Sequence, residues 1–300
     1  MNVTGQTISP EPQTESRPRG SLRRLVLYPL LVAAGCVLAF TLVRWMTHDS
    51  RTAEELTSVI RNSDGRRRWQ AAHELARRVA TEPEIRADPK LGRQAASLFA
   101  QTRTDDPLVA TYMARMLVLM APEGTERVLR DGLASDDASL RIHVALALAE
   151  VGGVETVSAL APLLEDEDSG VRKAAAFAVG RLGGREASGL LIPLLRDQEA
   201  DVRWNAALGL AAVGSDAGAE VLLRMLDRSY LDGISARLLA EGRRGMTDQE
   251  VAEVVVNAVR AAARLENPEL ARAIEGLWNG DESPRVREAA RIAIDRMDRG

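Results

Sequence analysis

Residues 171–182 read VRKAAAFAVGRL, and their apolar side chains recur at intervals of three and four. This spacing places the apolar residues on one face of an α-helix. Gly183 follows directly, and glycine accepts the left-handed backbone conformation that often ends a helix. A second helix is expected over residues 186–196. The stretch therefore predicts a helical hairpin.

The hairpin recurs with a period of 31 residues. An apolar residue followed by Arg stands at 140–141, 171–172 and 202–203, glycines stand at 152, 183 and 214, and Pro-Leu-Leu stands at 162–164 and 193–195. One hairpin cannot bury both of its sides, whereas a row of stacked hairpins can. The sequence thus predicts an all-α solenoid of about seven hairpins over residues 52–300. Its inner face is expected to be lined by the second helix of each hairpin.

Helix-capping signals set the other boundaries. Thr52 and Thr247 each begin a capping box, and Asp88, Asp106 and Asn267 each precede a proline at a helix start. Residues 228–247 interrupt the period and form either a short helix near 234–241 or a protruding loop. The expected helices are 53–62, 66–80, 89–101, 107–120, 123–134, 138–151, 154–165, 169–182, 186–196, 200–213, 217–227, 248–265, 268–279 and 284–297.

Composition supports closely packed helices and excludes several classes of protein. Hydrophobic residues make up 46% of the 300 residues but aromatic residues only 3%, so Ala, Leu and Val must fill the core. The formal net charge of −4 argues against nonspecific nucleic-acid binding, which needs a strongly basic surface. The single cysteine, Cys36, excludes a disulfide framework within one chain and a multi-cysteine zinc site.

An acidic residue precedes several of the repeated arginines by six positions. Asp166 with Arg172, Asp197 with Arg203, and Asp281 with Arg287 show this spacing, while Arg141 and Arg68 follow Ser135 and Asn62. The pattern resembles the HEAT-repeat family, particularly the short bacterial HEAT-like repeats also found in phycobilin lyases. The resemblance is close over residues 137–227. It implies an α-solenoid of the armadillo type in which these residues form a structural ladder of polar contacts between units.

The first 51 residues differ from the rest. Residues 1–24 are rich in Pro, Ser and Thr, which predicts a disordered tail. Residues 25–43 are uncharged and predict a transmembrane helix of about 28 Å, followed by a juxtamembrane linker over residues 44–51. Two alternatives to a transmembrane helix over this stretch are a signal peptide and a lipoprotein segment lipidated at Cys36. Four arginines before the span against two after it favour a single-pass protein with a periplasmic or extracytoplasmic solenoid. A cytoplasmic solenoid is the other possibility.

The sequence offers little for catalysis. His48, His73 and His143 are scattered and lack metal-ligand spacing. The acidic run 165–168 lacks the residue order of a calcium loop. We therefore expect a protein that is not an enzyme and has no metal or cofactor.

Aromatic residues are the candidates for partner binding. Trp69 and Trp204 occupy equivalent repeat positions, where we expect at least partial burial, and Tyr230 and Leu231 are expected to make exposed contacts in the irregular segment. The predicted function is a membrane-anchored, non-enzymatic scaffold that binds another protein, either alone or as an accessory subunit of an integral-membrane complex. The alternative is a lyase-like factor that attaches a chromophore or other cofactor.

Overall fold

The computed structural model describes residues 21–47 and 51–298, with only the backbone of 21–28 and 43–47. It contains two compact units, residues 1–51 and 52–300. The first unit holds helix α1 (Ser21–Thr47), which extends beyond the predicted span 25–43 at both ends. Most of the predicted tail lies outside the described residues. Over the described part of the chain, no helix combines the length and hydropathy required to cross a membrane.

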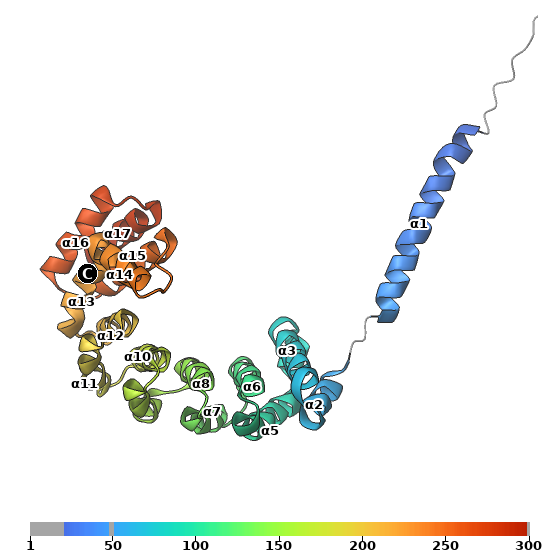
Figure 1. Cartoon of the computed structure of the whole chain (residues 1–300), viewed down its shortest axis with the longest axis horizontal. Coiled ribbons are helices and arrows are strands. Elements are labelled where there is room, and N and C mark those ends of the chain that lie inside the picture. Colours follow the sequence, from blue (N-terminus) through green and yellow to red (C-terminus); the bar gives the residue numbers. More distant parts are fainter. Residues whose placement is uncertain (1–20, 48–50, 299–300) are drawn as a thin grey trace, which may run out of the picture. The chain divides into compact units, whose positions relative to one another are not determined.

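The second unit confirms the predicted all-α repeat architecture. Its helices stack as pairs in two layers along an arc, and α3, α6, α8, α10 and α12 lie side by side on the concave layer (Figure 1). Packing of α12 on α15, and of α15 on α17, continues this row. The concave-row helices are α3 (Gly65–Thr81), α6 (Pro107–Met120), α8 (Ala138–Val151), α10 (Ser169–Leu182), α12 (Ala200–Ala212), α15 (Asp248–Ala262) and α17 (Pro284–Met297).

The other layer is built from shorter or interrupted helices. Pro162 and Pro193 lie in its repeated Pro-Leu-Leu segments, where the α-helix tightens to 3-10 geometry. Proline lacks the backbone N–H that would continue the α-helical hydrogen bonds. The convex-layer elements are α2 (Ala53–Asn62), α5 (Pro89–Asp105), α7 (Thr125–Arg130), η1 (Asp131–Ala134), η2 (Val154–Thr156), α9 (Val157–Leu160), η3 (Ala161–Glu165), α11 (Ala187–Leu191), η4 (Ile192–Arg196), η5 (Asp216–Gly218), α13 (Ala219–Leu226) and α16 (Pro268–Gly280).

The prediction that the second helix of each hairpin lines the inner face is wrong. The first helices, which carry the repeated arginines, form the concave layer (Figure 1). Small residues in these helices explain the direction of curvature. A Cβ atom added to Gly180 of α10 would lie 2.3 Å from the Cα atom of Gly209 in α12. Because the first helices approach so closely, the row bends toward them.

Most predicted helix boundaries are confirmed. Thr52 and Thr247 form capping boxes, and the side chains of Asp88, Asp106 and Asn267 accept hydrogen bonds at the starts of α5, α6 and α16. The short helix α4 (Pro83–Arg86) was not predicted, and the helix in the segment 228–247 is longer than predicted. That segment contains α14 (Arg228–Ala240), which begins six residues before the predicted short helix and is followed by irregular chain to Met246.

The core is aliphatic, as the composition predicts. One cluster of buried residues runs from Leu56 to Leu210, and a second runs from Trp204 to Ala293, so α12 contributes side chains to both. Buried alanines separate neighbouring helices throughout, which permits close packing with few aromatic residues. Helix α12 therefore joins the regular repeats to the region that contains the extra helix α14.

Candidate protein-binding groove

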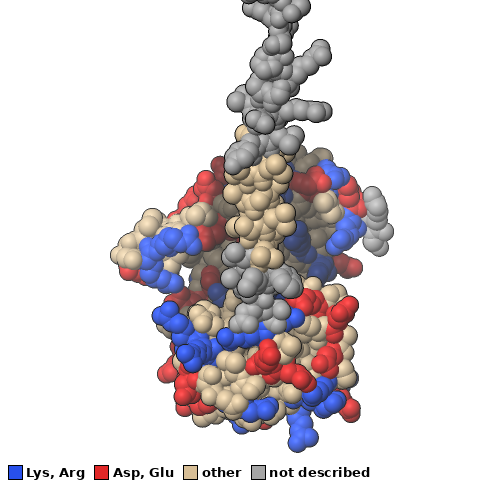
Figure 2. All heavy atoms as spheres, turned by 90° about the vertical axis from the view of Figure 1, so that its right-hand side faces the viewer, with Lys and Arg blue, Asp and Glu red and all other residues tan. Residues whose placement is uncertain are grey.

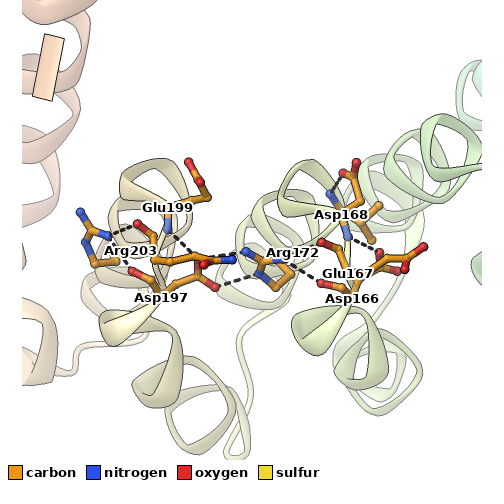
Figure 3. A network of polar contacts seen from close by, with 9 residues as sticks. Asp166, Glu167, Asp168, Arg172, Asp197, Glu199 and Arg203 are labelled. Atoms are coloured by element: carbon orange, nitrogen blue, oxygen red, sulfur yellow. Dashed lines mark hydrogen bonds and ion pairs between the residues drawn. The ribbon is translucent and has the colours of Figure 1, made fainter. Parts of the chain in front are cut away.

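The concave-layer helices are held in register by a ladder of arginines and aspartates (Figure 3). Arg172 donates through Nε and Nη2 to the two carboxylate oxygens of Asp197, at 2.8 and 3.1 Å. Its Nη1 donates to the backbone carbonyls of Asp166 and Glu167, at 2.8 and 3.1 Å. One guanidinium thus binds the turn before its own helix and the carboxylate of the next repeat.

The same arrangement recurs along the chain. Arg141 donates to the backbone carbonyl of Ser135 at 2.8 Å and to the Asp166 carboxylate at 2.9 Å. Arg203 and Arg287 donate to the carbonyls of the aspartates six residues before them, at 2.6 Å in both cases. Arg68 departs from the predicted pairing with Asn62: it donates to the carbonyl of Ile60 at 2.9 Å and to the Asp105 carboxylate at 3.1 Å.

Arg228 is a ladder residue that the sequence analysis missed. It lies at the start of α14 and donates to both carboxylate oxygens of Asp281, at 2.7 and 2.8 Å. The Asp281 side chain is 1% exposed, so its charge requires this partner. Arg228 stands 31 residues after Asp197, at the position where the period places a ladder aspartate, and its partner Asp281 lies 53 residues further on.

The ladder carboxylates are stabilised in their charged form. Burial raises the pKa of Asp166, Asp197 and Asp281, but hydrogen bonds from one arginine and from one backbone N–H outweigh burial and lower each pKa below its ordinary value. The arginines Arg141, Arg172 and Arg228 have raised pKa values, chiefly because of their hydrogen bonds to these aspartates. The ladder is therefore an array of fixed charges between repeats.

Exposed apolar side chains follow the concave layer at the repeat period. Leu146 on α8, Phe177 on α10 and Leu208 on α12 are spaced by 31 residues. Leu146 is 37% exposed and Phe177 is 43% exposed, while Leu208 is half-buried. These residues were not among the predicted contacts, although the period places them in one row. We call residues 146, 177 and 208 the apolar row.

Aromatic residues gather on the same layer. Four of the seven aromatic residues between positions 52 and 300 lie on concave-layer helices. Near α3 and α6, the His73 ring contacts Trp69 and Tyr112 edge-on, with centroids 6.0 and 5.6 Å apart. A pocket of about 370 Å³ lies beside Tyr112 and reaches His143 on α8. The concave layer therefore carries four aromatic side chains, of which Trp69 and Phe177 are exposed.

The four predicted contact residues lie in different environments. Trp204 is buried at 6% exposed, as expected, whereas Trp69 is exposed at 39%. Tyr230 is half-buried, and its hydroxyl accepts a hydrogen bond from Arg203 at 3.4 Å. The prediction for Leu231 is wrong: it is fully buried, because its segment is the helix α14 rather than a loop.

The remaining predicted groups show no assembled reactive centre within the described ranges. Cys36 is an exposed free cysteine on α1. No group of three or more His, Cys, Asp or Glu residues there has metal-binding geometry. The face of the repeat unit shown in Figure 2 carries basic and acidic side chains interspersed, rather than a field of one sign. Such a surface does not provide the basic stripe typical of a nucleic-acid interface.

The repeats match a known protein family. The protein-family model described as HEAT repeats matches residues 95–178 and 157–240. Residues 95–240 are HEAT repeats. No curated protein matches the chain.

Several solved structures of other proteins are similar to this chain. The Escherichia coli protein YibA is 15% identical with a TM-score of 0.52, covering 84% of this chain and 94% of that chain. The complex of CpcE and CpcF of phycocyanin lyase from Nostoc sp. PCC7120 contains a chain that is 18% identical with a TM-score of 0.48, covering 82% and 95%. An engineered protein is 22% identical with a TM-score of 0.46, covering 82% and 68%. The likeness to YibA shows the fold alone.

Proposed function

We propose that this chain is a non-enzymatic scaffold that binds another protein along the concave layer of its HEAT repeats. The observation that carries this proposal is the apolar row on the concave layer, which includes the exposed Phe177 in a chain with only 3% aromatic residues. Exposed apolar side chains that share one face are typical of interaction surfaces, since a solvent-facing helix otherwise presents polar residues. Stacked repeats also provide extended concave surfaces suited to long partner segments.

Site-specific photo-crosslinking tests this proposal. The photoreactive residue p-benzoylphenylalanine would replace Phe177 on the concave layer in one variant and Ile192 on the convex layer in another. These side chains are matched in exposure, at 43% and 46%. After irradiation of cells that express the full chain, we expect a discrete larger adduct from position 177 and none from position 192. Adducts from position 192 alone, or from neither position, would count against the proposal.

We further propose that α1 anchors the scaffold in a membrane, with the repeats on the extracytoplasmic side. The uncharged stretch 25–43 and the excess of arginines before it support this, as does the exposure of its apolar side chains, from Leu30 at 64% to Phe40 at 68%. Alkaline carbonate extraction of membranes should leave the full chain in the pellet and release a variant lacking residues 25–43. A reporter fused after Gly300 would reveal the side.

The alternative function, attachment of a chromophore or other cofactor, has a direct test. The purified full-length chain would be examined for visible absorbance and by mass spectrometry for a covalent adduct. A bound pigment in stoichiometric amount would replace the scaffold proposal with this alternative.

A further inference from the structure

One hollow on the concave layer is partly built by the segment that interrupts the repeats. A pocket of about 730 Å³ has residues of α8, α10 and α12 on one side and residues of α14, α15 and the chain between them on the other. All three members of the apolar row line it, together with Trp204. We call this the α12 pocket. Its second wall, which includes residues 243–246, belongs to no regular repeat.

Trp204 brings an unusual donor to this pocket. The side chain is more than nine-tenths buried, and its indole Nε1 has no hydrogen-bond partner among the described residues. An unpaired buried N–H is costly, so such groups are rare in folded proteins and require an explanation. Lys173 and Ile142 occupy the equivalent positions in the two preceding repeats, and Trp69, at the equivalent position near the start of the repeats, is 39% exposed.

The charged residues around the α12 pocket are already paired with one another. Arg244 donates to the carboxylate of Glu250 at 2.7 and 2.9 Å, and with the backbone N–H of Thr247 it lowers the pKa of Glu250 to about 2. Lys173 lies 3.3 Å from Asp201. The remaining pairs are Arg243 with Glu199 at 3.6 Å and Glu253 with Arg285 at 3.2 Å. A charged ligand would have to compete with these pairs, whereas an uncharged ligand would not.

We infer that the α12 pocket binds an uncharged segment of a partner polypeptide, with an apolar side chain against Phe177 and Leu208 and a backbone carbonyl that accepts from Trp204 Nε1. This inference rests on the proposed function, because it names the chemistry of the partner at that surface. The volume of about 730 Å³ exceeds that of a single side chain, and the apolar row continues toward α8, which favours an extended segment. The indole nitrogen is covered, so binding shifts the side chains above it.

The test uses the purified full-length chain and a random peptide library displayed on phage. Peptides that the chain enriches would be synthesised and their affinities measured for the wild type and for three variants. Trp204→Phe keeps an aromatic ring and removes the N–H, and we expect it to weaken binding by about two- to tenfold, the effect of losing one neutral hydrogen bond. Phe177→Ala, at a 43% exposed side chain, should weaken binding by about tenfold.

Trp278→Phe provides the matched control. Trp278 is 46% exposed on the convex-layer helix α16 and does not line the pocket, so this variant should bind as the wild type does. Labelling with 5-fluorotryptophan adds a direct readout by fluorine NMR. The resonance that disappears in Trp204→Phe identifies position 204, and it should shift when peptide is added. Circular dichroism would verify that each variant keeps its helical content.

The outcomes separate this inference from the proposed function. Uncharged peptides with a large apolar residue, sensitive to Trp204→Phe and Phe177→Ala, would support both. Enriched peptides that depend on neither residue, that leave the fluorine resonance of position 204 unmoved, or that are dominated by charged residues would overturn the inference and leave the scaffold proposal standing. Failure to enrich any peptide would count against the proposed function and therefore against both.

Discussion

Removal of the Asp197 carboxylate should destabilise the repeats far more than removal of a neighbouring carboxylate. Asp197→Ala removes two charge-assisted hydrogen bonds from Arg172 and one bond from the backbone N–H of Glu199, at 2.9 Å. The side chains of Arg172 and Asp197 are 10% and 12% exposed, so the variant leaves a buried guanidinium with only its two backbone acceptors. Breaking one half of a buried pair costs about 3 to 5 kcal/mol.

The matched control is Asp201, which lies four positions after Asp197. Lys173 and Asp201 connect the same two helices, α10 and α12, at 3.3 Å, but their side chains are 46% and 58% exposed. Exposed pairs contribute at most about 1 kcal/mol, because water and salt screen them. Asp201→Ala should therefore lower the free energy of unfolding by less than about 1 kcal/mol.

Urea denaturation of the full-length variants, followed by circular dichroism, measures this difference. Amide hydrogen exchange shows which helices are destabilised. Stability in stacked repeats is a sum over neighbouring units, so Asp197→Ala should speed exchange first in α10 and α12. The double variant Arg172→Met with Asp197→Leu should recover much of the loss, because it removes both buried charges. Equal costs for Asp197→Ala and Asp201→Ala would refute the assignment of stability to the buried ladder.

Three further predictions concern packing, the extra helix and pH. Gly180→Ala should lower the free energy of unfolding by about 1 to 3 kcal/mol, because the added methyl group would meet the backbone of Gly209. Gly189→Ala, which has open space around it, should be neutral or stabilising, and thermal melts would compare the two variants. Arg228→Ala should speed amide hydrogen exchange in α14 and α17, because the buried Asp281 carboxylate loses its guanidinium partner. Amide protection equal to that of the wild type would show that α14 docks by apolar packing alone. Acid should destabilise the repeats, because the ladder aspartates have lower pKa values in the folded state than in the unfolded state. Their contribution to the free energy of unfolding is complete above the unfolded pKa of about 3.9 and is lost as the pH falls through the folded pKa. The urea midpoint should therefore be constant above about pH 5 and fall below about pH 4.

The repeat period was sufficient to predict the local structure. Residues 138–151 and 169–182 form helices with the predicted bounds, because the apolar spacing, the capping aspartates and the terminal glycines all act within one repeat. The prediction was less successful for the second helices, where Pro162 and Pro193 convert the end of each helix to 3-10 geometry. The direction of curvature could not be predicted from one repeat, since it depends on how closely Gly180 approaches a residue 29 positions away.

The two equivalent tryptophans show what a periodic comparison cannot reveal. Trp69 and Trp204 both follow a ladder arginine, yet one is 39% exposed and the other 6% exposed. Trp204 shares a buried cluster with Leu231 and Ile234 of α14, and residues 243–246 line the pocket beside it. An insertion therefore turned a repeated surface position into the buried wall of a single pocket. We expect the specificity of partner binding to depend on the insertion rather than on the repeats that surround it, because the regular repeats present nearly the same surface several times over.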